Sequence, residues 1–254
     1  MTNNLFKYKP YFTVSTSISL LFIYFGCILF HKPDDINDIS PYIEWPLSFR
    51  LFSKCNECKD LRYQVWRLFT YSIVHLNVEH ILNNLIILNI LGIVIEMIEG
   101  HKVIFLIYII SIILGALSTA YFKPYVNIIG CSSGVYGVLG SCYSLIIINF
   151  KLFDNCIQII SFFIMFLLIV LHILIYEFKR GNRVGHYIHL VGFVYGVNIG
   201  FIILKPKEQF IYNRYLKYFG IGFSLTFTIL FLYDYITLTS AKSKIYKDEC
   251  CYIG

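Results

Sequence analysis

The sequence has 254 residues, of which 57% are hydrophobic and only 14% are charged, and its mean hydropathy is +0.68. Soluble domains carry about 25% charged residues, so this composition excludes both an ordinary soluble protein and an intrinsically disordered one. The net charge of +6 comes from Lys and Arg residues that are scattered between apolar stretches without forming a basic run. We therefore expect no nucleic-acid partner and predict that a lipid bilayer surrounds the chain.

Seven apolar stretches follow one another along the chain, separated by Lys, Arg, Asp, Gly or Pro. They span approximately residues 11–30, 81–96, 103–122, 133–150, 157–176, 187–204 and 218–238. A helix that crosses the hydrocarbon core needs about 20 mainly apolar residues, because each residue adds about 1.5 Å to its length. The pattern therefore predicts an all-α, polytopic membrane protein.

The second, fourth and sixth stretches are slightly short, contain polar residues and are interrupted by glycine. Such segments are stable in a bilayer only where protein or a water-filled cavity surrounds them. We therefore expect these three helices to form the interior of the protein.

The first stretch follows Lys7 and Lys9, as in a secretory signal sequence, but it is long and lacks a small-residue cleavage site. We interpret it as a retained span.

Residues 31–65 form the only long connection, which predicts an ordered or membrane-associated loop and marks no domain boundary. No repeat of about 20 to 50 residues is present, which argues against an inverted-repeat transporter. Alternate loops carry comparable numbers of Lys and Arg, so charge does not set the orientation.

Polar side chains at bilayer depth are candidates for function, because they cost several kcal/mol unless they are satisfied. In a chain that threads back and forth, the second, fourth and sixth helices all begin at the same membrane surface. His80 and Asn84 lie near the start of the second helix. Ser132 and His189 lie near the starts of the fourth and the sixth. We therefore expect these side chains to converge at similar depth.

A serine and a histidine that meet beside amide donors form a constellation for nucleophilic acyl transfer. The imidazole takes the hydroxyl proton, and N–H groups hold the oxyanion that develops on the attacked carbonyl. Glu96 and Glu177 lie toward the ends of their helices, so neither is placed to orient the imidazole. The sequence therefore predicts a Ser132–His189 dyad rather than a triad.

Glycines accompany both members of this dyad. Before the serine, Gly130 allows the chain to bend into a helix whose N-terminal N–H groups favour negative charge. After the histidine, three glycines share one helical face, at Gly192, Gly196 and Gly200. Small residues at this spacing let two membrane helices approach closely. We expect this face of the sixth helix to pack against Gly137 and Gly140 of the fourth.

At these residues the chain resembles a rhomboid intramembrane serine protease, over roughly Gln64 to Gly200. The Gly-x-Ser-Gly-x-x-aromatic-Gly signature of that family matches at Gly130, Ser132, Tyr136 and Gly137. Its His-x-x-Gly-x-x-x-Gly signature matches at His189, Gly192 and Gly196. Its His-x4-His-x3-Asn pattern fits His75, His80 and Asn84, after the Trp-Arg pair at Trp66 and Arg67. Its Gly-x3-Glu-x3-Gly run fits Gly92, Glu96 and Gly100. The motifs follow one another in the order of the family.

The resemblance implies a catalytic role for five of the matching residues. Ser132 corresponds to the family nucleophile and His189 to its general base. Asn84 and His80, together with the backbone N–H of Ser132, correspond to the oxyanion hole. Tyr136 matches the aromatic residue that stacks on the base.

Other matching positions correspond to supporting residues of the family. Arg67, His75 and Glu96 match positions that brace the first loop and its surroundings. One position departs from the family pattern, because Ser133 stands where a glycine usually follows the nucleophile. Ser133 is therefore a competing nucleophile by sequence, although the ungapped match through Tyr136 places the nucleophile at Ser132.

The resemblance also implies an architecture and a location. Residues 1–10 are expected to form a short N-terminal tail, residues 11–204 a six-helix catalytic core, and residues 205–254 a seventh transmembrane helix and a tail. In that family the N-terminus is cytosolic and the site opens to the luminal or extracellular side. We therefore expect a multi-pass protein of the plasma membrane or of a secretory-pathway organelle.

Simpler explanations exist for several of these residues. A serine in a membrane helix usually hydrogen-bonds to the backbone of its own helix. His80 could serve simply to hydrogen-bond one helix to another. A zinc site at His75, Glu79 and His80 is disfavoured, because the histidines are five residues apart rather than four. Cys55 and Cys58 form a single pair without the second pair of a structural zinc site. The sequence therefore predicts neither a metal nor another cofactor.

The combined prediction is an intramembrane serine endopeptidase that cleaves single-span membrane proteins in or near their transmembrane segments. The alternative is a catalytically inactive rhomboid-like protein that binds membrane clients and controls their trafficking. Such proteins typically lose the dyad, whereas both of its residues are present here. A small transporter is a weaker alternative, because it would more naturally pair charges or contain repeats. The sequence does not indicate an oligomeric state.

Overall fold

The computed structural model describes residues 6–30, 64–122, 128–152 and 186–237, together with residues 156, 157, 160, 163 and 167. Its long helices are α1 (Tyr11–Phe30), α3 (Val78–Glu99), α4 (His101–Phe122), α5 (Ser132–Ile148), α7 (His186–Ile203) and α8 (Ile211–Thr237). Two short elements accompany them, α2 (Arg67–Thr70) and the 3-10 turn η2 (Phe150–Leu152). The described residues are thus organised almost entirely as helices, which confirms the predicted all-α class.

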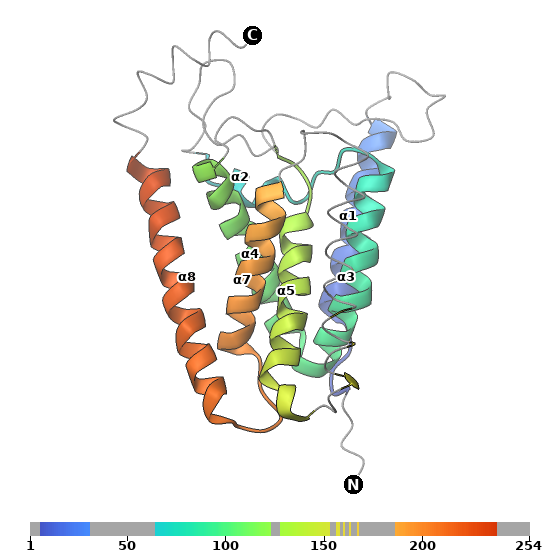
Figure 1. The fold of residues 1–254 in the computed structure, drawn as a ribbon. Helices are drawn as coiled ribbons and strands as arrows, with labels where there is room; N and C mark the ends of the chain where they lie inside the picture. Colours follow the sequence, from blue (N-terminus) through green and yellow to red (C-terminus); the bar gives the residue numbers. More distant parts are fainter. Residues whose placement is uncertain are drawn as a thin grey trace.

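Helix α5 lies at the centre of the bundle. It packs against α7, α4 and α3, while α8 packs on α7 and α4, and α1 packs on α3 and α4. Figure 1 shows α8 at one edge of the bundle and α1 beside α3 at the other, with the central helices between them. The starts of α3, α5 and α7 lie at the same end, as the alternation of the chain requires (Figure 1).

Within the described residues, four helices are long and apolar enough to cross a membrane: α1, α3, α4 and α8. The apolar helices α5 and α7 are shorter. The protein is therefore an integral, polytopic membrane protein. Most of the predicted span at 157–176 and nearly all of the predicted loop at 31–65 lie outside the described residues. The proposed boundaries of tail, core and seventh helix stay predictions.

Two helices begin earlier than the apolar pattern predicts. Helix α3 begins at Val78, because the side chain of Asn77 accepts a hydrogen bond from the His80 N–H at 2.9 Å and caps the first turn. Helix α8 begins at Ile211 and includes a polar first turn around Asn213. Hydropathy underestimates both lengths, since it cannot count polar residues that cap or extend a helix at the membrane surface.

The interior is not divided among the helices as expected. Helix α5 is buried from Ser132 to Ser141. Within an apolar 18-residue segment of each of the other two helices, 61% of the residues are buried in α4 but only 39% in α3. The outer face of α3 is exposed at intervals of four residues, at Leu82, Ile86, Ile90 and Val94. The prediction that α3 belongs to the interior together with α5 and α7 therefore holds for one face of α3 only. Its buried polar residues, His80, Asn84 and Glu96, lie among the residues that face the bundle, and the exposed face from Leu82 to Val94 is apolar enough to meet lipid.

The backbones of α5 and α7 approach closely through glycine. A Cβ on Gly196 would collide with the carbonyl of Gly137, and a Cβ on Gly140 would collide with the carbonyl of Phe193. The Ser144 hydroxyl adds a hydrogen bond across the same interface, because it donates to the carbonyl of Val197 at 2.6 Å. The expected packing of the two glycine faces is therefore confirmed.

Glu96 joins α3 to α1 at the end of the bundle opposite the starts of α3, α5 and α7. Its side chain is fully buried and accepts hydrogen bonds from the backbone N–H groups of Phe12 at 2.7 Å and Thr13 at 2.8 Å. A carboxylate at this position caps α1 and complements its dipole. The expectation that Glu96 braces the first loop is therefore wrong. Glu96 lies near the C-terminal end of α3 and binds the first turn of α1, whereas the first loop follows the last turn of α1.

The Gly196→Ala substitution tests the close packing of α5 and α7. We expect it to destabilise the folded protein by about 1–3 kcal/mol, because the added methyl group overlaps a backbone carbonyl. The measurement is thermal unfolding of the purified protein in detergent. The control is Gly222→Ala on α8, where a Cβ meets no heavy atom within 4 Å. Equal unfolding temperatures for both variants would contradict the proposed packing.

Candidate active site

Ser132 and His189 meet at the end of the bundle where α5 and α7 begin. The distance between His189 Nε2 and Ser132 Oγ is 2.8 Å, which is a hydrogen-bonding distance. Both side chains are buried, with 5% and 8% of their surfaces exposed. The expected convergence of these two residues is confirmed. In this arrangement the imidazole is placed to remove the hydroxyl proton.

The turn before α5 holds Ser132 in this position. Gly130 has a φ of +109°, a conformation that side chains other than glycine rarely adopt. Its N–H donates to the carbonyl of Tyr71 at 2.8 Å, which ties the turn to the segment after α2. A Cβ on Gly130 would lie only 2.6 Å from His80 Cε1, so glycine also makes room for the imidazole of α3.

Asn84 and His80 lie one helical turn apart on the buried face of α3. The side-chain nitrogen of Asn84 is buried and has no acceptor within the described structure. The Leu76 N–H donates to His80 Nδ1 at 3.4 Å, which favours the tautomer that carries its proton on Nε2. Nε2 lies on the side of Gly130, directly before the serine turn. His80 thus lies beside the turn that carries Ser132, and Asn84 follows it one turn later on the buried face of α3. Their role as oxyanion donors stays a prediction.

The ring of Tyr136 stacks on the imidazole ring of His189. Tyr136 lies one turn after Ser132 on α5, and the two ring centroids are 4.5 Å apart with planes within 5°. Because both rings are buried and nearly parallel, the contact fixes the plane in which His189 presents its nitrogen to Ser132.

Ser133 faces away from the dyad. Its side chain is fully buried and its hydroxyl donates to the carbonyl of Ser111 on α4 at 2.6 Å. The hydrogen bond engages the only proton that the hydroxyl carries. The structure therefore places Ser132, and not Ser133, beside the imidazole.

His75 and Arg67 occupy supporting positions near the serine turn and α2. His75 is fully buried and its Nε2 accepts a hydrogen bond from the N–H of Cys131 at 3.3 Å, directly before Ser132. Burial lowers the pKa of His75 to about 4, so the ring is neutral and remains an acceptor. Arg67 donates from Nε to Gln64 at 2.6 Å, while the rest of the loop it was predicted to brace lies outside the described residues.

The described residues contain no group of three His, Cys, Asp or Glu side chains that could hold a metal ion. The rings of His75 and His80 contact each other edge to face, with centroids 5.1 Å apart.

The profile of the Rhomboid domain matches residues 62–206 of the sequence, which include every residue of the site. The chain belongs to the rhomboid family. It is 27% identical over 165 residues to rhomboid-related protein 2 of Mus musculus, which covers 63% of this chain and 55% of the relative. It is 30% identical over 153 residues to RHOMBOID-like protein 1 of Arabidopsis thaliana, with coverages of 60% and 38%.

Another relative is named as inactive. Inactive rhomboid-related protein 2 of Caenorhabditis elegans is 25% identical over 188 residues, which cover 72% of this rhomboid and 52% of the relative. This rhomboid thus spans about half or less of the length of the relatives it matches. Because a relative of this rhomboid is named as inactive, family membership alone does not decide the activity, and the site has to be judged by its chemistry.

Sequence reasoning missed an aromatic cluster beside the dyad. Phe231 of α8 contacts Tyr121 and Phe122 at the end of α4, with ring centroids 5.5 and 5.9 Å away. Phe122 in turn stacks on Tyr187, two residues before His189, at 5.5 Å. Helix α8 therefore contacts, through Phe122, the start of the helix that carries the histidine. Nothing in the order of these residues along the chain signals that they meet.

Replacement of Tyr136 tests whether ring stacking positions the imidazole. We expect Tyr136→Leu to slow the reaction of Ser132 with a fluorophosphonate probe by about 3- to 10-fold, since buried aromatic pairs contribute about 0.5–1.5 kcal/mol. Tyr136→Phe keeps the stacked ring and serves as the control, with a labelling rate close to that of the unchanged protein. Equal rates for the Leu and Phe variants would argue against a positioning role.

Proposed function

We propose that this rhomboid is an intramembrane serine endopeptidase that cleaves single-span membrane proteins in or near their transmembrane segments. The observation that carries the proposal is the 2.8 Å contact between His189 Nε2 and Ser132 Oγ, because it couples a nucleophile to a base. The buried side-chain nitrogen of Asn84, which has no acceptor within the described residues, supports it further.

The first step of the proposed reaction is attack of Ser132 Oγ on the scissile carbonyl carbon. His189 Nε2 accepts the hydroxyl proton as the new C–O bond forms. Tyr136 keeps the imidazole in plane during this transfer, since the two rings are stacked. No acidic residue is assigned to the dyad, and the ring contact supplies part of the orientation that a carboxylate gives in a triad.

The negative charge that develops on the carbonyl oxygen needs donors that are already in place. Asn84 Nδ2, His80 Nε2 and the backbone N–H of Ser132 are the proposed donors. Ser132 begins α5, so the helix dipole also favours negative charge at this point. His189 then returns its proton to the leaving amine, and water releases the acyl group from Ser132 by the reverse sequence.

The substrate class follows from the location of the site and from the family. A helix in a membrane satisfies its own backbone groups, so a peptide bond becomes available for attack only where the helix unwinds. The proposed substrates are therefore single-span proteins with small, helix-destabilising residues close to the membrane surface at which α3, α5 and α7 begin.

The orientation is proposed from the family. Alternate loops of the sequence carry comparable numbers of Lys and Arg, so charge does not decide it. By resemblance to the family, we propose that the N-terminus is cytosolic and that the site opens to the luminal or extracellular side.

A second candidate function is the binding and trafficking of membrane clients without proteolysis. The relative from Caenorhabditis elegans that is named as inactive favours this alternative. The two functions differ in whether Ser132 is reactive, so a test of that hydroxyl separates them.

Labelling with a fluorophosphonate probe tests the nucleophile. We expect the purified protein to be labelled, Ser132→Ala to lose labelling and cleavage of a reporter transmembrane segment, and Ser133→Ala to keep most of both. Ser133 is a matched control because it is the adjacent hydroxyl and is engaged by the Ser111 carbonyl. Loss of labelling in Ser133→Ala alone would move the nucleophile by one residue. A folded protein that does not react at all would favour the client-binding function.

Two asparagines of α3 allow a separate test of the oxyanion hole. We expect Asn84→Ala to lower kcat about 100-fold, as the loss of one oxyanion donor does in other hydrolases. The unfolding temperature should not fall, because the Asn84 amide nitrogen has no acceptor to lose.

Asn89→Ala is the matched control for this test. The Asn89 side chain donates to Ser17 Oγ of α1 at 2.8 Å and to the Leu85 carbonyl at 2.7 Å. Its loss should lower the unfolding temperature and leave kcat nearly unchanged. A fall in stability without a fall in kcat for Asn84→Ala would make this residue structural.

A further inference from the structure

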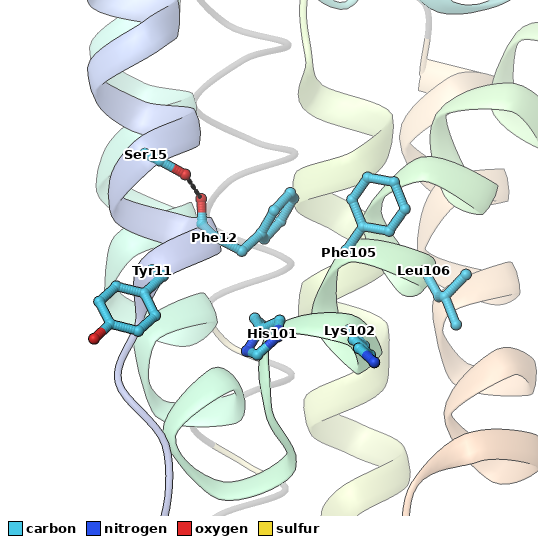
Figure 2. A pocket seen from close by; sticks show the side chains of 7 residues that line it. All are labelled: Tyr11, Phe12, Ser15, His101, Lys102, Phe105 and Leu106. Carbon is cyan, nitrogen blue, oxygen red and sulfur yellow. Dashed lines mark hydrogen bonds between the residues drawn. The ribbon is translucent and has the colours of Figure 1, made fainter.

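A groove lies between the first turns of α1 and α4, at the end of the bundle opposite the dyad. Its volume is about 700 Å³. It is lined on one side by residues of α1, Tyr11, Phe12 and Ser15, and on the other by residues of α4, His101, Lys102, Phe105 and Leu106. Figure 2 shows these two sets of side chains on either side of the groove, with Phe12 and Phe105 directed toward each other.

The deeper part of the groove is apolar. The rings of Phe12 and Phe105 meet edge to face with centroids 5.6 Å apart. Phe105 and Leu106 remain 46% and 45% exposed. Both α1 and α4 are long and apolar enough to cross the membrane, so this exposed surface faces the bilayer and not water. A hydrocarbon chain is the occupant that this part of the groove accommodates.

The mouth of the groove is cationic. His101 and Lys102 are exposed at the first two positions of α4, and neither side chain has a hydrogen bond or ion pair to another residue of the described structure. Lys7 and Lys9 precede α1 at the same end and add positive charge.

The acidic groups nearby are already engaged. The Glu96 carboxylate is occupied by the first turn of α1, and Glu99 accepts from the Lys205 N–H at 3.4 Å and interacts with the charges of Lys205 and Lys7. Neither is paired with Lys102. The side chains at the mouth are thus available to an external anion, which has to sit at the level where a membrane helix begins.

We propose that this groove binds an anionic phospholipid of the leaflet opposite the dyad. An acyl chain lies along Phe12, Phe105 and Leu106, and the phosphate lies beside Lys102 and His101. The combination decides the ligand: a soluble anion would leave the apolar part of the groove empty, and a zwitterionic lipid would bring a cationic group to a cationic mouth. The lipid would join α1 to α4 and stabilise the folded state through linked binding.

The experiment uses the full chain, purified in detergent and freed of lipid. It is titrated with phosphatidylglycerol or with phosphatidylcholine of the same acyl chains, and bound lipid is counted by native mass spectrometry. Thermal unfolding is followed in parallel. We expect phosphatidylglycerol to remain bound and to raise the unfolding temperature, and phosphatidylcholine to do neither. Inorganic phosphate should also have no effect.

Two pairs of variants locate the lipid. Lys102→Gln should weaken the binding of phosphatidylglycerol about fivefold, since a basic residue near an anionic lipid contributes about 1 kcal/mol. Its control is Lys217→Gln, an exposed lysine of α8 at the same end. Leu106→Trp should block the groove, and its control is Leu225→Trp, at a leucine of α8 that is 58% exposed.

Three results would overturn the proposal. They are equal binding of the two lipids, equal losses in the groove variants and their controls, and a stabilisation by inorganic phosphate that equals that by phosphatidylglycerol. Lipid binding and unfolding are read without any assay of proteolysis, so the outcome is independent of whether Ser132 is reactive. Unfolding of each variant without lipid identifies any that are simply misfolded.

Discussion

The separation between the backbones of α5 and α7 sets the distance on which the proposed chemistry depends. Ser132 and His189 lie near the starts of these two helices, so any residue that pushes the helices apart also separates hydroxyl from imidazole. The helices touch where Gly196 faces the Gly137 carbonyl and where Gly140 faces the Phe193 carbonyl. Between lipid-solvated helices, such backbone contact replaces the hydrophobic driving force that joins helices in water.

Burial strengthens the electrostatic interactions that the polar groups at this end of the bundle can make. A hydrogen-bond donor without an acceptor is costly inside a protein, and the amide nitrogen of Asn84 is such a donor. If Asn84 acts as the proposed oxyanion donor, it is held in place before the reaction and needs no reorganisation when charge develops beside it.

The sequence predicted the described helices from the length of their apolar stretches. It predicted the meeting of Ser132 with His189 from the alternation of the chain across the membrane and from the glycines that let α5 and α7 approach. It did not predict the exposed face of α3 or the contact of Phe231 with Phe122. In a bilayer, residues that face lipid and residues that face protein are equally apolar, so hydropathy cannot separate them. The position of Glu96 was misjudged for another reason: a motif aligns residues along the chain, whereas the helix places this one at the opposite membrane surface from His80.

Ser133 illustrates how a departure from a family pattern is accommodated by distant residues. A glycine at this position would present only backbone to α4, whereas the serine needs space and an acceptor. Gly115 of α4 supplies the space, since a Cβ there would collide with Ser133 Oγ, and the carbonyl of Ser111 supplies the acceptor at 2.6 Å. Because the hydroxyl is satisfied away from the imidazole, the extra side chain adds a contact between α4 and α5 and leaves Ser132 as the hydroxyl that faces His189.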